Sequence, residues 1–129
     1  MIKFLEKKIE QDFCIGVRPY GKAIKLQGLS YTGFPDRTAM MPGGVICFVE
    51  FKRPGEEPTP RQKRVMAELT KLGFECFVID DFRDAAILAG ALRAFSWDRQ
   101  ERPEYRKGFT IAEAYEAEQE RQGRRSNAI

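Results

Sequence analysis

The sequence contains no histidine, and this absence is the most informative feature of its composition. Catalytic Ser-His-Asp and Cys-His arrangements are therefore excluded, as are zinc or nuclease sites that bind their metal through imidazole. Any hydrolytic chemistry must depend on carboxylates, lysine and a hard cation such as Mg²⁺, which prefers oxygen ligands.

Cysteine and long apolar runs are also scarce. The 3 cysteines, Cys14, Cys47 and Cys76, stand singly inside apolar stretches, a pattern typical of reduced, buried thiols rather than of disulfides. No stretch approaches the roughly 18 apolar residues of a membrane span, and the first residues, MIKFLEKKIEQ, lack the apolar core of a signal peptide. We expect a cytoplasmic protein, in the host cell if it is viral, without membrane contact.

The charge balance gives a formal net charge of only +3 over 129 residues, a length that suits one hydrophobic core. Bulk positive charge therefore cannot hold this chain on a nucleic acid. Such binding would need a local basic surface, or a metal ion that neutralises a group of acids.

Residue periodicity predicts an α/β fold with a mixed sheet flanked by helices. Apolar residues at helical spacing predict a helix over 3–15, with Glu6 and Glu10 beside its apolar stripe. Strands are expected at 22–29, 37–41, 45–52 and 74–79, with a hairpin turn at Pro42-Gly43-Gly44. A capping box at Thr59-Pro60-Arg61-Gln62 starts a helix with Val65, Met66, Leu69 and Leu72 as its buried face, ending at Gly73. The strand-helix-strand unit predicts that the last two strands are parallel.

The C-terminal third changes character after Trp97. A helix is expected from Phe82 to about Phe95, followed by a charged segment over 98–108. A second capping box at Thr110 predicts a polar helix to about Gln122, and the last residues, GRRSNAI, read as a basic tail. We expect a domain over 1–97 and an extension over 98–129 that serves as a dimer arm, a DNA clamp or a disordered tail.

The segment from Gly33 to Gly55 holds the candidate site. Asp36 and Glu50 lie on the two arms of the predicted hairpin, where they can converge on one Mg²⁺ ion. Lys52 follows Glu50 by two residues, so it points to the same face about 7 Å along the strand. The backbone carbonyl of Phe51 borders the same place as a further ligand. Separately, each motif is more often a turn or a surface ion pair; their combination around a buried strand favours metal chemistry.

A family resemblance rests on these motifs in order: Gly33-Phe34-Pro35-Asp36, Pro42-Gly43-Gly44, Phe48-Val49-Glu50-Phe51-Lys52, Pro58-Thr59-Pro60-x-Gln62 and Leu72-Gly73-Phe74. Over residues 5–95 this order resembles the VRR-NUC (virus-type replication-repair nuclease) family of the PD-(D/E)xK superfamily. The resemblance implies a Mg²⁺-dependent endonuclease, with Mn²⁺ as a substitute. Short members of this kind are phage or prophage proteins that look like Holliday-junction resolvases, which implies a homodimer acting on branched DNA.

The resemblance also implies roles for individual residues. Asp36 and Glu50 would be metal ligands, Lys52 the catalytic lysine, and Glu10 the helix-borne acid that completes the site. Glu6 is the alternative to Glu10, since both flank the same apolar stripe. Gln62 would match the family's glutamine at the start of a helix, although the capping box alone is sufficient to explain it.

Contacts with DNA are expected from basic residues beside these positions: Arg37, Arg53, Arg61 and Lys63. Two other functions fit the same residues. The chain could be a non-catalytic DNA-binding subunit on a nuclease scaffold, although such a scaffold would not need Asp36, Glu50 and Lys52 together. It could also be a restriction-type nuclease for linear duplexes, although no recognition domain is visible in the sequence.

Overall fold

A computed structural model describes residues 2–26, 31–101 and 110–123. The elements follow in chain order: α1 (Ile2–Val17), β1 (Lys22–Ile24), β2 (Arg37–Met41), β3 (Val45–Phe51), α2 (Pro60–Lys71), β4 (Glu75–Ile79), α3 (Phe82–Glu101) and α4 (Ile111–Arg121). The strands form one sheet in the order β1-β2-β3-β4, in which β1, β2 and β3 are antiparallel and β4 is parallel to β3. The predicted α/β fold with a mixed sheet is confirmed.

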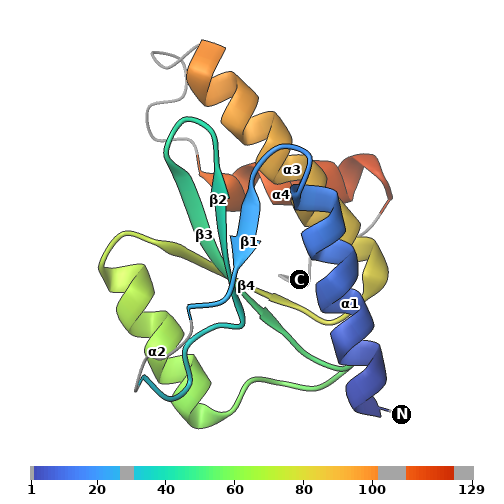
Figure 1. Ribbon diagram of the computed structural model, residues 1–129, viewed down its shortest axis with the longest axis vertical. Helices are drawn as coiled ribbons and strands as arrows, with labels where there is room; N and C mark the ends of the chain where they lie inside the picture. The colour runs from blue at the N-terminus through green and yellow to red at the C-terminus, as the bar shows by residue number, and fades with distance from the viewer. Residues whose placement is uncertain (1, 27–30, 102–109, 124–129) are drawn as a thin grey trace.

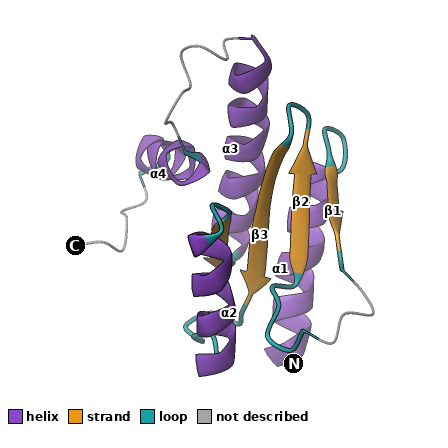
Figure 2. Ribbon diagram, turned by 90° about the vertical axis from the view of Figure 1, so that its left-hand side faces the viewer, coloured by secondary structure: helices purple, strands orange, loops and turns teal. Residues whose placement is uncertain are grey.

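Helices cover both faces of this sheet (Figure 1). On one face, the larger core joins α1, α3 and α4 to the strands through residues that include Phe13, Phe51 and Leu92. On the other face, Phe48 packs with Val65 and Leu69 of α2. Figure 2 shows α2 in front of the strands and α1 behind them. α2 therefore lies on one side of the sheet, and α1 lies on the other.

The turn of the β2–β3 hairpin sets the register of the two strands beside the candidate site. Gly43 and Gly44 have φ values of 86° and 72°, in the left-handed region that glycine adopts without strain. The turn pairs Met41 with Val45, and at the other end of the hairpin Arg37 pairs with Val49. β3 lies between β2 and β4 and is buried at every position except Ile46, as expected for a central strand.

The start of α2 matches its prediction in detail. Thr59 is the N-cap, Pro60 is in the first turn, and both hydrogen bonds of the capping box with Gln62 are present. Of the expected buried face, Val65 and Leu69 are buried and Met66 is half-buried, whereas the prediction was wrong at Leu72, which is 73% exposed. Leu72 is the C-cap residue, so its side chain no longer follows the helical stripe that Val65 and Leu69 bury.

Three other boundaries differ from expectation. β1 ends at Ile24 rather than continuing to 29, and residues 27–29 of that prediction lie outside the described residues. α3 continues past Phe95 to Glu101, because buried Ser96 donates a hydrogen bond to the Pro42 carbonyl and so ties the helix to the hairpin turn. α1 extends to Val17.

The second capping box does start a helix, and α4 packs on the core. Ile111 is buried in the larger core. The backbone amides of Ile111 and Ala112 donate to the Glu75 carboxylate at 2.8 and 2.9 Å, so a β4 side chain holds the N-terminus of α4. The predicted tail beyond Gly123 lies outside the described residues.

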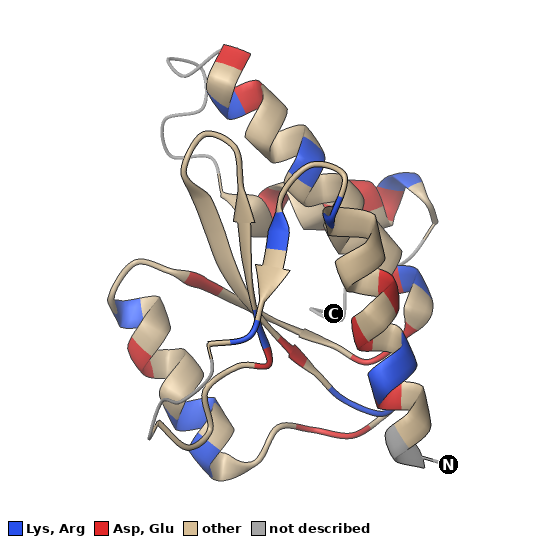
Figure 3. Cartoon of the chain, viewed as in Figure 1, with Lys and Arg blue, Asp and Glu red and all other residues tan. Residues whose placement is uncertain are grey.

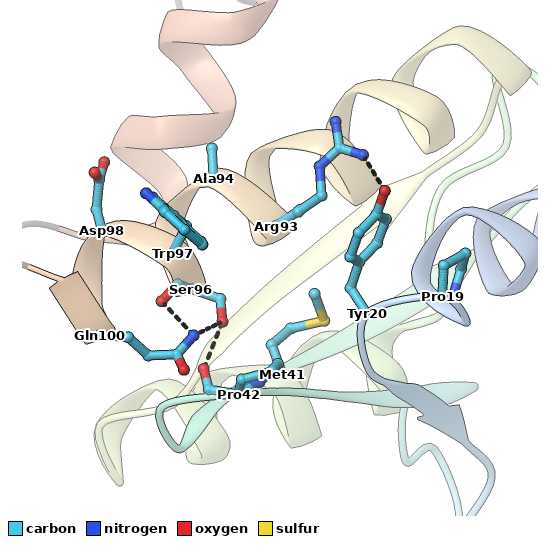
Figure 4. A pocket seen from close by; sticks show the side chains of 10 residues that line it. All are labelled: Pro19, Tyr20, Met41, Pro42, Arg93, Ala94, Ser96, Trp97, Asp98 and Gln100. Carbon is cyan, nitrogen blue, oxygen red and sulfur yellow. Dashed lines mark hydrogen bonds between the residues drawn. The ribbon is translucent and has the colours of Figure 1, made fainter.

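All three cysteines are free thiols; Cys14 and Cys47 are buried and Cys76 is half-buried. Within the described ranges, no helix has the length and apolar character needed to cross a membrane. A cavity of about 610 Å³ lies beside Pro42, Tyr20 and Trp97 (Figure 4), at the turn end of the hairpin and away from Asp36.

Candidate active site

The open end of the β2–β3 hairpin brings the predicted acids together. Asp36 directly precedes β2, and Glu50 lies near the end of the antiparallel partner β3. The Asp36 carboxylate accepts a hydrogen bond from the backbone N–H of Phe51 at 2.8 Å through Oδ2. The main chain of Phe51 therefore borders the Asp36 carboxylate, while its side chain is fully buried against Phe13.

Glu50 is the most enclosed acid of the site, with only 3% of its surface exposed. Its Oε2 accepts a hydrogen bond from Gln62 Nε2 at 2.9 Å and lies 3.5 Å from Lys52 Nζ. Its Oε1 is buried without a hydrogen-bond partner among the described residues. Burial, then the nearby Asp36 charge, raises the pKa of Glu50 to about 7, against the opposing effect of Lys52.

Asp36, like Glu50, has a raised pKa. Burial raises the pKa of its carboxyl above the usual range; the Phe51 N–H opposes this effect, and the charge of Glu10 adds to it. Burial thus disfavours the ionised form of both carboxyl groups, which additional positive charge would stabilise. A divalent cation shared by Asp36 and Glu50 would supply that charge.

Lys52 comes immediately after β3, and its chain position is fixed by a hydrogen bond from its N–H to the Ile79 carbonyl at 3.0 Å. The residue is buried, with 8% of its surface exposed. Its ion pair with Glu50 shows that the two side chains share one face, as their spacing predicted. A buried lysine beside an acid is expensive to desolvate, which favours a role at a charged ligand.

The charge of Glu10 contributes to the raised pKa of Asp36, but the Glu10 carboxylate already has two basic partners of its own. Its carboxylate accepts a 2.7 Å hydrogen bond from Arg37 Nε and lies 3.8 Å from Lys25 Nζ. Lys25 follows β1 and was not predicted; no sequence signal marks it, because only the fold brings it to α1. Glu6 is half-buried one turn earlier, and its raised pKa is caused by burial and then by the Asp36 charge. Both helix acids therefore face the site.

Gln62 has two functions that the sequence could not separate. Its Oε1 accepts a hydrogen bond from the Thr59 backbone N–H at 2.8 Å, which completes the capping box. Its Nε2 donates to Glu50 at the same time. The start of α2 is thus joined to the end of β3 through one side chain.

The basic residues that were predicted to contact DNA differ in whether they are already paired with an acid. Arg37 bonds to Glu10, Arg53 pairs with Glu56 at 2.6 Å, and Lys63 lies 3.9 Å from Glu57. Arg61 is exposed and forms no ion pair with the described residues. Figure 3 shows basic segments on α2, and others on β1 and the end of α1.

A separate acidic group lies at the start of α3. Oxygens of Asp80, Asp81 and Asp84 lie within 4.8 Å of one another, the only such trio among the described residues, and this arrangement could hold a cation. Asp80 accepts from the Gly55 N–H at 3.0 Å, and Asp81 from the Asp84 N–H at 2.7 Å. These carboxylates therefore also cap α3 and hold the loop after Lys52.

Comparison with known proteins identifies the family. No model of a protein family matches the chain. The chain is 42% identical over 84 residues to "Putative nuclease p44" of Acyrthosiphon pisum secondary endosymbiont phage 1, a match that spans 64% of this chain and 90% of the relative. This chain belongs to the VRR-NUC family. A solved structure described as "VRR_NUC domain" also superposes on it, with a TM-score of 0.61 and 29% identity, covering 66% of this chain and 94% of the other.

The open end of the hairpin therefore brings together two acids and one lysine as candidate site residues. The candidate metal ligands are the carboxylate oxygens of Asp36 and Glu50, which are of the kind that Mg²⁺ prefers. Among the described residues, Oε1 of buried Glu50 has no hydrogen-bond partner, and this fits such an ion, because an unpaired buried oxygen is otherwise costly. Glu10 does not join Asp36 and Glu50 in a trio with all oxygens within 4.8 Å.

Proposed function

We propose that this VRR-NUC domain is a Mg²⁺-dependent endonuclease that cuts branched DNA such as four-way junctions. One observation supports it above all. Glu50 and Lys52 are buried next to half-buried Asp36, and one Glu50 oxygen has no hydrogen-bond partner among the described residues. A purely structural ion pair would not require a second acid beside it.

The roles of the residues follow from their contacts. Asp36 and Glu50 would hold the cation, which supplies a more acidic bound water and neutralises charge on the phosphate. Gln62 keeps Glu50 in one orientation through the 2.9 Å hydrogen bond. Lys52 places an ammonium beside Glu50, where it can face the attacking water or the scissile phosphate.

Selectivity for branched DNA and a homodimeric state are further parts of the proposal. They are supported by the resemblance to short phage members of the family and by the phage origin of the matched relative. A four-way junction has two equivalent strands to cut, and a two-fold symmetric dimer would present one site to each. Light scattering on the purified protein measures the dimer independently of cleavage.

The test is a cleavage panel on linear, flapped and four-way DNA, with Mg²⁺, with Mn²⁺ and with EDTA. We expect cutting of the branched substrates with either metal and none with EDTA. Asp36→Asn and Glu50→Gln should each abolish cutting while the protein remains folded and still binds DNA. Unchanged cleavage by both variants would refute the site. Binding without any cleavage by the wild-type protein would instead support a non-catalytic subunit.

A further inference from the structure

A groove between α1 and β1 adjoins the site described above and shares Arg37 with it. Its volume is about 530 Å³. The apolar part of its lining comes from Cys14 and Ile15 of α1 and from Ala23 and Ile24 of β1. Arg18, Lys22 and Arg37 add positive charge to the same lining. The groove thus combines an apolar surface with cations that come from three separate elements or their ends.

Two of the three cations that line this groove have no acidic partner among the described residues. Arg18 and Lys22 are exposed, and neither side chain forms an ion pair or hydrogen bond within residues 2–26, 31–101 and 110–123. Burial raises the pKa of the Cys14 thiol, and the charges that act on it come from Arg37, Glu10, Arg18 and Lys25. Lys25 and Arg37 are both within ion-pair distance of Glu10, so Arg18 and Lys22 carry the unmatched positive charge here.

The groove is joined to the candidate active site through Arg37. One nitrogen of this guanidinium bonds to Glu10 at 2.7 Å, and another bonds to the Ala23 carbonyl of β1 at 3.1 Å. α2, with Arg61 and Arg64, lies on the opposite face of the sheet from α1. The acids at the end of the hairpin are thus flanked by basic residues in two directions.

We propose that this groove binds the sugar–phosphate backbone of one DNA strand that extends from the active site. The inference rests on the proposed function, since it takes the substrate to be DNA. A nucleic-acid backbone alternates anionic phosphates with less polar sugars, which matches cations around an apolar surface. An added peptide strand fits less well, because the edge strand β1 is only 3 residues long and begins with an exposed lysine.

The experiment compares two double variants with the same change in charge. Arg18→Gln/Lys22→Gln removes two groove cations, and Lys71→Gln/Arg99→Gln removes two exposed cations at the end of α2 and on α3. Both are made in a Glu50→Gln background, so that binding is measured without cutting. Fluorescence anisotropy with labelled four-way and single-stranded DNA gives the dissociation constant at several salt concentrations.

We expect the groove variant to bind about tenfold more weakly, with a log–log salt slope reduced by about 2, since each lost phosphate contact lowers the slope by about 1. The control variant should keep the wild-type slope, and Arg18→Lys should retain most of the binding. Equal slopes for the two double variants would overturn the groove assignment. If the wild-type protein still cuts DNA with Mg²⁺, equal slopes overturn the groove proposal and leave the proposed function standing. If the wild-type protein cuts no DNA, the proposed function fails, whatever the slopes are.

Both groove side chains are exposed, so their replacement should leave the fold intact. The melting temperature of each variant checks this. As a second measurement, a photoreactive amino acid at Ile15, which is 58% exposed in the groove, should cross-link to bound DNA. The same probe at Leu72, 73% exposed at the end of α2, should not. Equal cross-linking from both positions would also overturn the proposal.

Discussion

Gln62 Nε2 donates a hydrogen bond of 2.9 Å to Glu50 Oε2, and this bond joins the first turn of α2 to the end of β3. The same side chain accepts from the Thr59 backbone N–H at 2.8 Å. A residue that the sequence presents as a helix cap is therefore also in contact with the proposed metal ligand. Both functions use different atoms of one amide, so they can be separated by substitution.

Gln62→Glu should separate these functions. A glutamate at this position still completes a capping box, but it replaces the amide donor with an oxygen that repels Glu50. We expect cleavage to fall by about 10- to 100-fold, as for other residues that orient a metal ligand. Thr59→Ala is the matched control, which should cost about 1 kcal/mol of stability with kcat retained. Wild-type cleavage by Gln62→Glu would restrict Gln62 to capping.

Stability of the metal-free protein should depend on pH through Glu50. Its pKa is about 7 in the folded protein, raised from 4.5, so the folded state favours the protonated form. This contribution is fully present below pH 4.5 and is lost as pH rises through 7, by about 3 kcal/mol in total. Urea unfolding in EDTA at about pH 5 and pH 8 measures the difference, and Glu50→Gln should reduce it.

Mg²⁺ should raise the stability of the protein mainly at the higher pH, because it binds the ionised carboxylate. Equal effects of Mg²⁺ at both pH values would contradict this linkage.

The two helix acids can be distinguished by paired substitutions. Glu10 is 6% exposed and bonded to Arg37, whereas Glu6 is half-buried. We expect Glu10→Gln to reduce cleavage at least about tenfold, because it weakens the hold on Arg37 beside Asp36. Glu6→Gln should remain close to wild type in single-turnover assays. The reverse order of the two variants would assign the helix-borne acid to Glu6.

Two glycines should respond oppositely to replacement by alanine. A Cβ at Gly21 would lie 2.4 Å from the Met40 carbonyl oxygen, so Gly21→Ala must displace β2 backbone and should cost about 1–3 kcal/mol. Gly90 is inside α3, and among the described residues no atom beyond the adjacent chain of its own helix lies within 4 Å of an added Cβ. Gly90→Ala should stabilise the protein by about 0.5–1 kcal/mol. Denaturant midpoints measure both changes, and destabilisation by Gly90→Ala would contradict the open space seen there.

Local sequence patterns determined much of this fold because their causes are local. Glycine at the hairpin turn, the capping boxes at Thr59 and Thr110 and the apolar run of β3 each depend on neighbours within a few residues. Alternation along β3 likewise predicts that Glu50 and Lys52 share one face, and their ion pair agrees with it. Helix and strand ends were harder: α3 continues past Phe95 because Ser96 meets Pro42, a contact between residues far apart in the chain.

The sequence alone excluded catalysis and metal binding through imidazole, because it contains no histidine, and it left carboxylates and lysine as the candidate groups. Only the tertiary structure decided which of those groups are buried and which of them contact each other. It buries Glu50 beside Asp36, leaves one Glu50 oxygen without a partner among the described residues, and brings Lys25 and Arg37 to Glu10. These relationships depend on burial and on contacts between distant segments, and both arise only when α1, the hairpin and α2 pack around one sheet.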